Sequence, residues 1–281
     1  MENSEKLKQI VKEKYTEIAL QSKEQNETSC CGVGSTCGVD YTIFSEDYSK
    51  LEGYDPNADL GLGCGLPTEF ALIKKGDVVV DLGSGAGNDC FVSRAIAGET
   101  GKIIGIDMTE AMINKARENA DKLGFNNVEF RLGEIERMPI TSNVADVVVS
   151  NCVLNLVPNK VNAFKEIYRV LKPGGHFSIS DVVLIGELPD GLKQDAEMYA
   201  GCVSGAIQKN EYLSIIEKTG FENKSIQKEK AVSIPDEILK NYLSGKELAD
   251  YKNGAFGIFS ITVYADKPIA QSCCTPSSGC C

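Results

Sequence analysis

The chain has 281 residues, of which 42% are hydrophobic and 25% charged, and a formal net charge of −11. This composition is ordinary for a globular protein, while the negative charge and the lack of basic stripes argue against nucleic acid as a partner. No apolar run approaches the roughly 20 residues that a membrane-spanning helix needs, which argues against a membrane protein.

Residues 1–27 predict an amphipathic helix with Leu7, Ile10, Val11, Tyr15 and Ile18 on one side. This segment has no hydrophobic signal region, so we expect a cytoplasmic protein. The Cys- and Gly-rich stretch that follows, residues 28–40, cannot form regular structure for long. Residues 40–70 look irregular and carry a second glycine cluster, "LGLGCGLP". We therefore predict an N-terminal cap segment over residues 1–69.

From residue 77 onward, strand patterns alternate with helix patterns. Strands are predicted in "DVVVDLG", "KIIGIDM", "NVEFRLG", "ADVVVSN" and "HFSISDVVL". Helices are predicted in "NDCFVSRAIA", in "TEAMINKARENADKLG" with a threonine cap, and in "KVNAFKEIYRVL". This alternation predicts an α/β fold with a doubly wound parallel sheet, which we assign to residues 70–187.

After Leu188 the alternation weakens. Residues 190–206 and 209–221 look helical, and residues 255–268 alternate like an exposed antiparallel strand. We predict a smaller α+β C-terminal domain over residues 188–268, followed by a flexible Cys-rich tail at 269–281.

A glycine loop follows the first predicted parallel strand, with Gly83, Gly85 and Gly87 at the start of a helix. Glycines there let backbone amides approach a ligand closely. Asp107 ends the second strand, where a carboxylate can accept hydrogen bonds from ribose hydroxyls. Glu134 and Ile135 follow the third strand, where an adenine edge would lie. The candidate cofactor-binding residues are Asp81, Gly83, Gly85, Gly87, Asp107, Met108, Glu134, Ile135 and Asn151.

These elements, with the "LKPGG" turn at 171–175, resemble the class I S-adenosylmethionine-dependent methyltransferases over about residues 70–185. The resemblance implies a Rossmann-like methyltransferase domain that binds S-adenosylmethionine. The alternative is a nucleotide-binding Rossmann domain. His176 directly follows the turn, and we expect a structural role for it.

The chain holds eleven cysteines against a single histidine, which in an intracellular protein indicates metal or redox chemistry. Cys152 lies just past the fourth strand in "SNCVLNL", Cys64 lies between glycines, and Cys202 lies between small residues. Their wide separation excludes a zinc-finger knuckle. If all three reach the carboxyl rim of the sheet, they form a trithiolate pocket for a thiophilic centre.

The segments "GLGCGLP", "SNCVLNLVPNK" and "GCVSGA", with the terminal Cys-Cys pairs, resemble the arsenite methyltransferases. The resemblance implies that Cys64, Cys152 and Cys202 bind trivalent arsenic. It also implies a fourth, N-terminal cysteine that pairs with Cys64. Cys30, Cys31 and Cys37 compete for that role, with Cys37 favoured by proximity. The implied scheme has the cysteines form a disulfide after methyl transfer, and thioredoxin or a small thiol such as glutathione resets them.

Other readings of the same residues stay open. Cys90, in the helix after the glycine loop, is expected to be core. The tail cysteines, Cys273, Cys274, Cys280 and Cys281, either capture arsenite or are dispensable. The chain as a whole could instead methylate a quinone or another carbon acceptor. It could also be a non-catalytic, thiol-rich binding protein, which the intact glycine loop argues against.

Overall fold

The computed structural model describes residues 2–21, 46–187, 205–231, 236–240, 242–253 and 256–269. Of the cysteines, Cys64, Cys90 and Cys152 lie in these ranges, and none of these three forms a disulfide. The predicted helix at 190–206 lies almost wholly outside them. Cys30, Cys31, Cys37, Cys202 and the four tail cysteines lie outside them as well.

Seven strands form one sheet in the order β3-β2-β1-β4-β5-β7-β6. The strands are β1 (Val78–Leu82), β2 (Lys102–Asp107), β3 (Val128–Leu132), β4 (Ala145–Asn151), β5 (Leu171–Ile185), β6 (Glu222–Ala231) and β7 (Gly257–Asp266). The first five are parallel, and β7 is antiparallel to both β5 and β6. From β1 the strands are added first toward one edge of the sheet, as β2 and β3, and then toward the other, as β4 and β5. Ligands of doubly wound sheets bind at the switch point between these two halves, here between β1 and β4.

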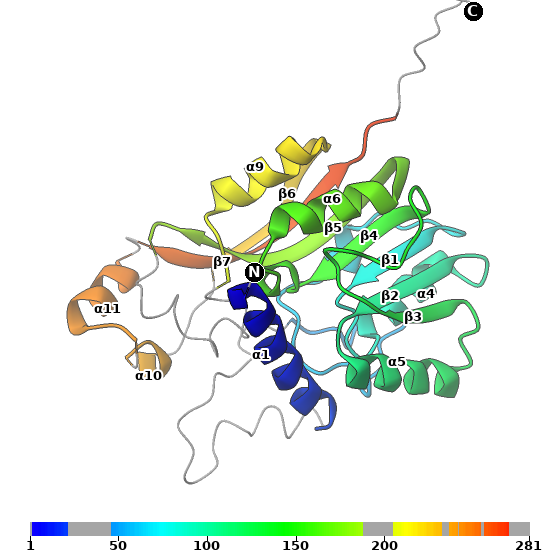
Figure 1. Cartoon of the computed structure of the whole chain (residues 1–281), viewed down its shortest axis with the longest axis horizontal. Coiled ribbons are helices and arrows are strands. Elements are labelled where there is room, and N and C mark those ends of the chain that lie inside the picture. The colour runs from blue at the N-terminus through cyan, green and yellow to red at the C-terminus, as the bar shows by residue number, and fades with distance from the viewer. Residues whose placement is uncertain are drawn as a thin grey trace, which may run out of the picture.

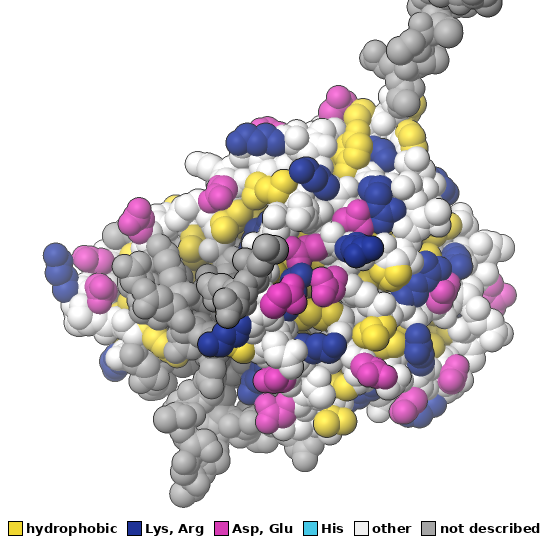
Figure 2. Space-filling view, in the orientation of Figure 1, with side chains coloured by type: hydrophobic (Ala, Val, Ile, Leu, Met, Phe, Trp, Pro, Cys, Tyr) yellow, Lys and Arg dark blue, Asp and Glu magenta, His cyan; other side chains and the backbone are white. Residues whose placement is uncertain are grey.

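Helices cover both faces of the sheet (Figure 1). The helices are α1 (Glu2–Ala19), α3 (Pro67–Phe70), α4 (Asn88–Ala97), α5 (Glu110–Leu123), α6 (Lys160–Val170), α9 (Lys209–Thr219), α10 (Asp236–Leu239) and α11 (Gly245–Lys252), with the short 3-10 helix η3 (Leu154–Leu156). In the described part of the chain, none of the helices is both long and apolar enough to cross a membrane. Acidic and basic side chains are mixed over the face seen in Figure 2.

Alternation along each strand creates two separate cores, because successive side chains of a strand point to opposite faces. Val80 and Ile104 join the core under α6 and α9. Their sequence neighbours Val79 and Ile103 join the core under α4 and α5. Both faces of β1, β2 and β4 are therefore largely buried, which explains why these strands are mostly continuous apolar runs rather than alternating ones.

The structure confirms the predicted α/β fold, and α4 has the predicted bounds. The threonine before α5 is at the N-cap position, but its side chain makes no capping bond. Its backbone N–H instead donates to Asp107.

The C-terminal strands differ from expectation in their position. β7 is antiparallel as predicted, but it is an interior strand between β5 and β6 and is mostly buried, so its predicted exposure is wrong. Strand β6 was not predicted, because its sequence "ENKSIQKEKA" is polar and mostly exposed at the sheet edge. The strands of region 188–268 thus extend the main sheet and form no sheet of their own. The division of the chain at residues 69, 187 and 268 stays a prediction.

Candidate active site

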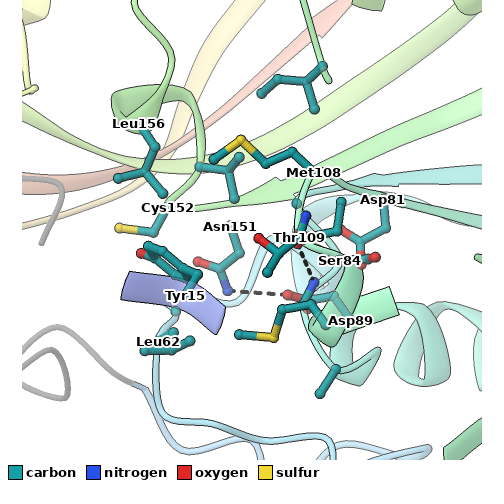
Figure 3. Close-up of a pocket in the computed structure, with 18 of the residues that line it drawn as sticks. Tyr15, Leu62, Asp81, Ser84, Asp89, Met108, Thr109, Asn151, Cys152 and Leu156 are labelled. Carbon is teal, nitrogen blue, oxygen red and sulfur yellow. Dashed lines mark hydrogen bonds between the residues drawn. The ribbon is translucent and has the colours of Figure 1, made fainter. Parts of the chain in front are cut away.

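A cavity with an empty volume of about 1080 Å³, including its opening to solvent, lies at the carboxyl ends of β1, β2 and β4. Every predicted cofactor residue except Gly87 lines it. Helix α1 contributes Lys8, Val11 and Tyr15 to the wall. In Figure 3, Cys152 and Tyr15 lie at one side of this cavity and Asp81 at the other, with Asn151 between them. The cavity lies at the carboxyl rim of the sheet, where the sequence places these residues, and their cofactor-binding roles stay predictions.

The three glycines of the loop have positive φ angles, but their surroundings differ. A Cβ atom on Gly83 would lie 2.2 Å from Cγ2 of Val153, and one on Gly87 would lie 2.8 Å from the ring of Phe91. A Cβ on Gly85 would meet nothing within 4 Å. Gly83 and Gly87 therefore allow close packing of the protein, whereas Gly85 leaves free space where a ligand can approach the backbone.

Six acidic residues line the same cavity, and three of them, Asp81, Asp89 and Asp107, have carboxyl groups whose pKa is raised. Burial, together with the nearby charge of Asp89, raises the pKa of Asp81 well above its usual value. Burial raises the pKa of Asp89 to about 6, although hydrogen bonds from Tyr48 and Asn151 oppose that shift. Burial also raises the pKa of Asp107. A cationic ligand would favour the charged form of all three groups.

Asp107 accepts hydrogen bonds from the backbone N–H groups of Gly85, at 3.1 Å, and Thr109, at 2.8 Å. These bonds fix the carboxylate beside the glycine loop. Glu134 instead forms an ion pair with Lys8 of α1 at 2.7 Å, and Lys8 also pairs with Glu136 at 2.8 Å. Helix α1 is thus tied to the loop after β3.

Two buried polar atoms of the loop and of α4 have no hydrogen-bond partner, Oγ of Ser84 and Oδ1 of Asn88. Both residues line the cavity. Since buried polar atoms are nearly always paired, atoms of this kind are available to a polar ligand. With the three carboxyl groups and the open space at Gly85, they suit a ligand that is both polar and cationic.

Cys64 and Cys152 are buried, at 1% and 4% exposure, in one apolar cluster with Leu156 and Val182. Both thiols also act electrostatically on the hydroxyl of Tyr212. Cys152 has a positive φ of 59°, which a non-glycine residue rarely adopts. Its backbone N–H donates to the carbonyl of Ser180 at 2.8 Å, which continues the pairing of β4 with β5 by one residue.

Cys90 is fully buried and its thiol donates to Oδ2 of Asp81 at 3.2 Å. Burial raises the pKa of this thiol well above its usual value. The core position expected for Cys90 is confirmed. His176 bonds the carbonyl of Ala71 at 2.6 Å and lies against the ring of Tyr264, in keeping with the structural role expected for it.

The third expected arsenic ligand, Cys202, and the expected disulfide partner, Cys37, lie outside the described residues. Among the residues that are described, no three His, Cys, Asp or Glu side chains gather as a metal site. The thiol assignments therefore stay predictions.

Sequence reasoning missed several residues of the cavity wall, among them Tyr48, Asp89 and Ser84. Asp89 had a usable signal, since an acidic residue stands in the first turn of a helix that follows a glycine loop. Tyr48 had none, because it lies in an irregular segment and reaches the site only through the tertiary fold.

Comparison with known proteins agrees with this geometry. A family model described as a methyltransferase domain matches residues 73–220. The arsenite methyltransferase of Halobacterium salinarum is 39% identical over 277 residues, covering 94% of this chain and 67% of that protein. The arsenite methyltransferase of Aquipseudomonas alcaligenes is 33% identical, covering 82% of this chain and 66% of that protein.

Among solved structures, an arsenic(III) S-adenosylmethionine methyltransferase from Chlamydomonas reinhardtii superposes with a TM-score of 0.63 at 34% identity. That match covers 75% of this chain and 69% of the algal one. The chain thus spans about two thirds of the length of these relatives.

Proposed function

Since the chain belongs to the arsenite methyltransferase family, we propose that it transfers a methyl group from S-adenosylmethionine to trivalent arsenic held by cysteine thiolates. The observation that carries this proposal is the burial of two thiols, Cys64 and Cys152, neither of them in a disulfide, in one cluster beside the cavity at the switch point. A carbon-acceptor methyltransferase has no need of such a pair.

The cavity suits S-adenosylmethionine, whose sulfonium supplies an electrophilic methyl group on a good leaving group. Asp81, Gly83 and Gly85 would hold its methionine part, while Gly87 packs the loop against Phe91, and Asp107 would accept hydrogen bonds from the ribose hydroxyls. Met108, Glu134 and Ile135 would contact the adenine. The raised pKa values of Asp81 and Asp107 support this assignment. They mean that burial in the cavity disfavours the charged carboxylates, and the positive charge of a bound sulfonium would offset this cost.

Cys64, Cys152 and Cys202 would hold arsenic through three thiolates, which leaves the arsenic neutral with a lone pair. That lone pair forms the new bond to carbon, and no general base is needed because arsenic has no proton to lose. The protein's contribution is to hold the arsenic in line with the methyl group, which is worth several kcal/mol of the barrier. The apolar cluster around the two thiols would keep water away from the reacting atoms.

Methyl transfer formally oxidises arsenic to the pentavalent state. Two cysteines, which we assign as Cys64 and Cys37, would return the two electrons by forming a disulfide. Thioredoxin or a small thiol such as glutathione would reduce that disulfide and reset the enzyme. The reductant, the cytoplasmic location and the absence of a nucleic-acid partner are parts of this proposal.

Replacing the thiols tests the proposal. Cys64→Ser and Cys152→Ser should each abolish arsenite-dependent methyl transfer, while calorimetric affinity for S-adenosylmethionine stays within about threefold. Cys90→Ala is the matched control, a buried thiol whose hydrogen bond goes to Asp81. It should change the KM for S-adenosylmethionine and leave the KM for arsenite unaltered. Retained turnover in Cys152→Ser would refute the thiolate mechanism.

A further inference from the structure

The side chain of Asn151 forms hydrogen bonds with the backbone on both sides of the Cys64 Cα atom. Asn151 is the last residue of β4 and directly precedes Cys152. Its Oδ1 accepts a hydrogen bond from the backbone N–H of Cys64 at 2.9 Å. Its Nδ2 donates to the carbonyl of Gly65 at 2.8 Å. One carboxamide thus joins the strand end that carries one thiol to the segment that carries the other.

The two glycines that flank Cys64 are explained by this close approach. A Cβ atom on Gly63 would lie 2.6 Å from Nδ2 of Asn151, and its three nearest atoms all belong to that carboxamide. A Cβ on Gly65 would lie 2.6 Å from Oγ of Ser180. Neither glycine has a positive φ, so the backbone conformation does not demand glycine at these positions. The "GCG" sequence instead lets the segment pack against the end of β4 and against Ser180 within β5.

The carboxamide is itself held in place. Its Nδ2 donates to the hydroxyl of Tyr48, which in turn donates to the carboxylate of Asp89, and Asp89 also lies 3.3 Å from Nδ2 (Figure 3). Tyr48 is buried. The amide dipole therefore has one orientation that satisfies all its neighbours, and it cannot flip without losing the bond to Cys64.

We propose that Asn151 is a positioning residue that sets the separation of the Cys64 and Cys152 thiols for a shared arsenic atom. This inference rests on the function proposed above. One atom can bond both sulfurs only if both backbones stand in a fixed relation before it arrives. Two more hydrogen bonds hold these backbones in place. The hydroxyl of Ser260 donates to the carbonyl of Cys64, and the backbone N–H of Cys152 donates to the carbonyl of Ser180. Ordering the thiols in advance lowers the entropic cost of binding.

A double-mutant cycle tests this proposal in the full-length protein. Asn151→Ala and Gly63→Ala should each lower kcat/KM for arsenite by about tenfold or more, which corresponds to losing about 1.4 kcal/mol. The double variant should be no worse than Asn151→Ala alone, because the added methyl group then occupies the space that the carboxamide has left. Calorimetric affinity for S-adenosylmethionine should stay within about threefold in Gly63→Ala, and in the two variants that lack Asn151 it should fall by less than kcat/KM for arsenite does.

Asn127→Ala is the matched control. The carboxamide of Asn127 likewise both donates and accepts hydrogen bonds: it donates to the carbonyls of Gly98 and Gly101 and accepts from Arg94, and it does not line the cavity. It should lower the thermal unfolding temperature and leave the KM for arsenite unchanged. A KM for arsenite raised equally by Asn127→Ala would mean that general destabilisation explains the effect, and would overturn the proposal.

Two further results would overturn it. Weakened S-adenosylmethionine binding with an unchanged KM for arsenite would make Asn151 a cofactor ligand. Multiplying effects in the double variant would show that the two residues act separately. If Asn151→Ala does not fold, Gly63→Ala alone decides, since an unchanged KM for arsenite in that variant contradicts the proposal. Failure of the proposed function is recognised separately, as a wild-type protein without arsenite-dependent turnover.

Discussion

Gly83 and Gly85 lie two residues apart in one loop, and replacing each with alanine should separate packing from ligand binding. Both have positive φ, 65° and 51°, so alanine costs about 1 kcal/mol of backbone strain at either position. At Gly83 the new Cβ also meets Val153 at 2.2 Å, and such overpacking adds about 1–3 kcal/mol. We expect a loss of stability of about 2–4 kcal/mol for Gly83→Ala and about 1 kcal/mol for Gly85→Ala.

Urea unfolding measures the stability and calorimetry measures the affinity for S-adenosylmethionine. Gly85→Ala should weaken cofactor binding by about tenfold or more despite its small effect on stability, because its methyl group projects into the cavity. In a Val153→Ala background, the cost of Gly83→Ala should fall to about 1 kcal/mol. Equal stability losses for the two variants, or an unchanged affinity in Gly85→Ala, would refute this reading of the loop.

Three further predictions concern charged groups. Because a cationic cofactor favours the charged form of Asp89, whose pKa is about 6, calorimetric affinity for S-adenosylmethionine should fall as the pH drops below that value; affinity that is constant with pH contradicts this. Burial raises the pKa of Asp181 to about 7, so its stabilising contribution is present below the unfolded-state pKa and lost as the pH rises through 7. Between about pH 4 and 8, the free energy of unfolding of the wild type should fall by up to about 4 kcal/mol relative to that of Asp181→Asn, as measured by chemical unfolding. Parallel pH profiles of the two proteins would contradict a raised pKa of Asp181. Lys8→Met should raise the KM for S-adenosylmethionine, because Lys8 forms ion pairs that join the cavity-lining α1 to Glu134 and Glu136. High salt should reduce the difference in KM between this variant and the wild type. An unchanged KM would show that α1 does not help to hold the cofactor.

Much of the fold could be predicted from local signals. Valine-rich runs such as that of β4 are buried on both faces, so they read as strands without any tertiary information. The glycine loop and Asp107 could be assigned because parallel strands bring their carboxyl ends to one edge of the sheet. The same rule put Cys152 beside the cavity, where the structure has it.

The rest depends on tertiary contacts that no local pattern encodes. Strand β6 is polar because it is a mostly exposed edge strand, so its composition resembles a loop. The apolar stripe of α1 predicted a buried helix face, but nothing in it indicated that Tyr15 would line the cofactor cavity. Cys64 stood out by its flanking glycines, yet Asn151, which accepts a hydrogen bond from the backbone N–H of Cys64, lies 87 residues away.

The central claim is that buried thiols present arsenic to the methyl donor, and the most direct test is a methyl-transfer assay on the wild-type protein. The assay uses labelled S-adenosylmethionine and a thiol reductant, with and without arsenite. We expect label in methylated arsenicals only when arsenite is present, and none with Cys152→Ser. Bound cofactor without any arsenite-dependent transfer would contradict the account and leave Cys152 as a residue of the apolar cluster.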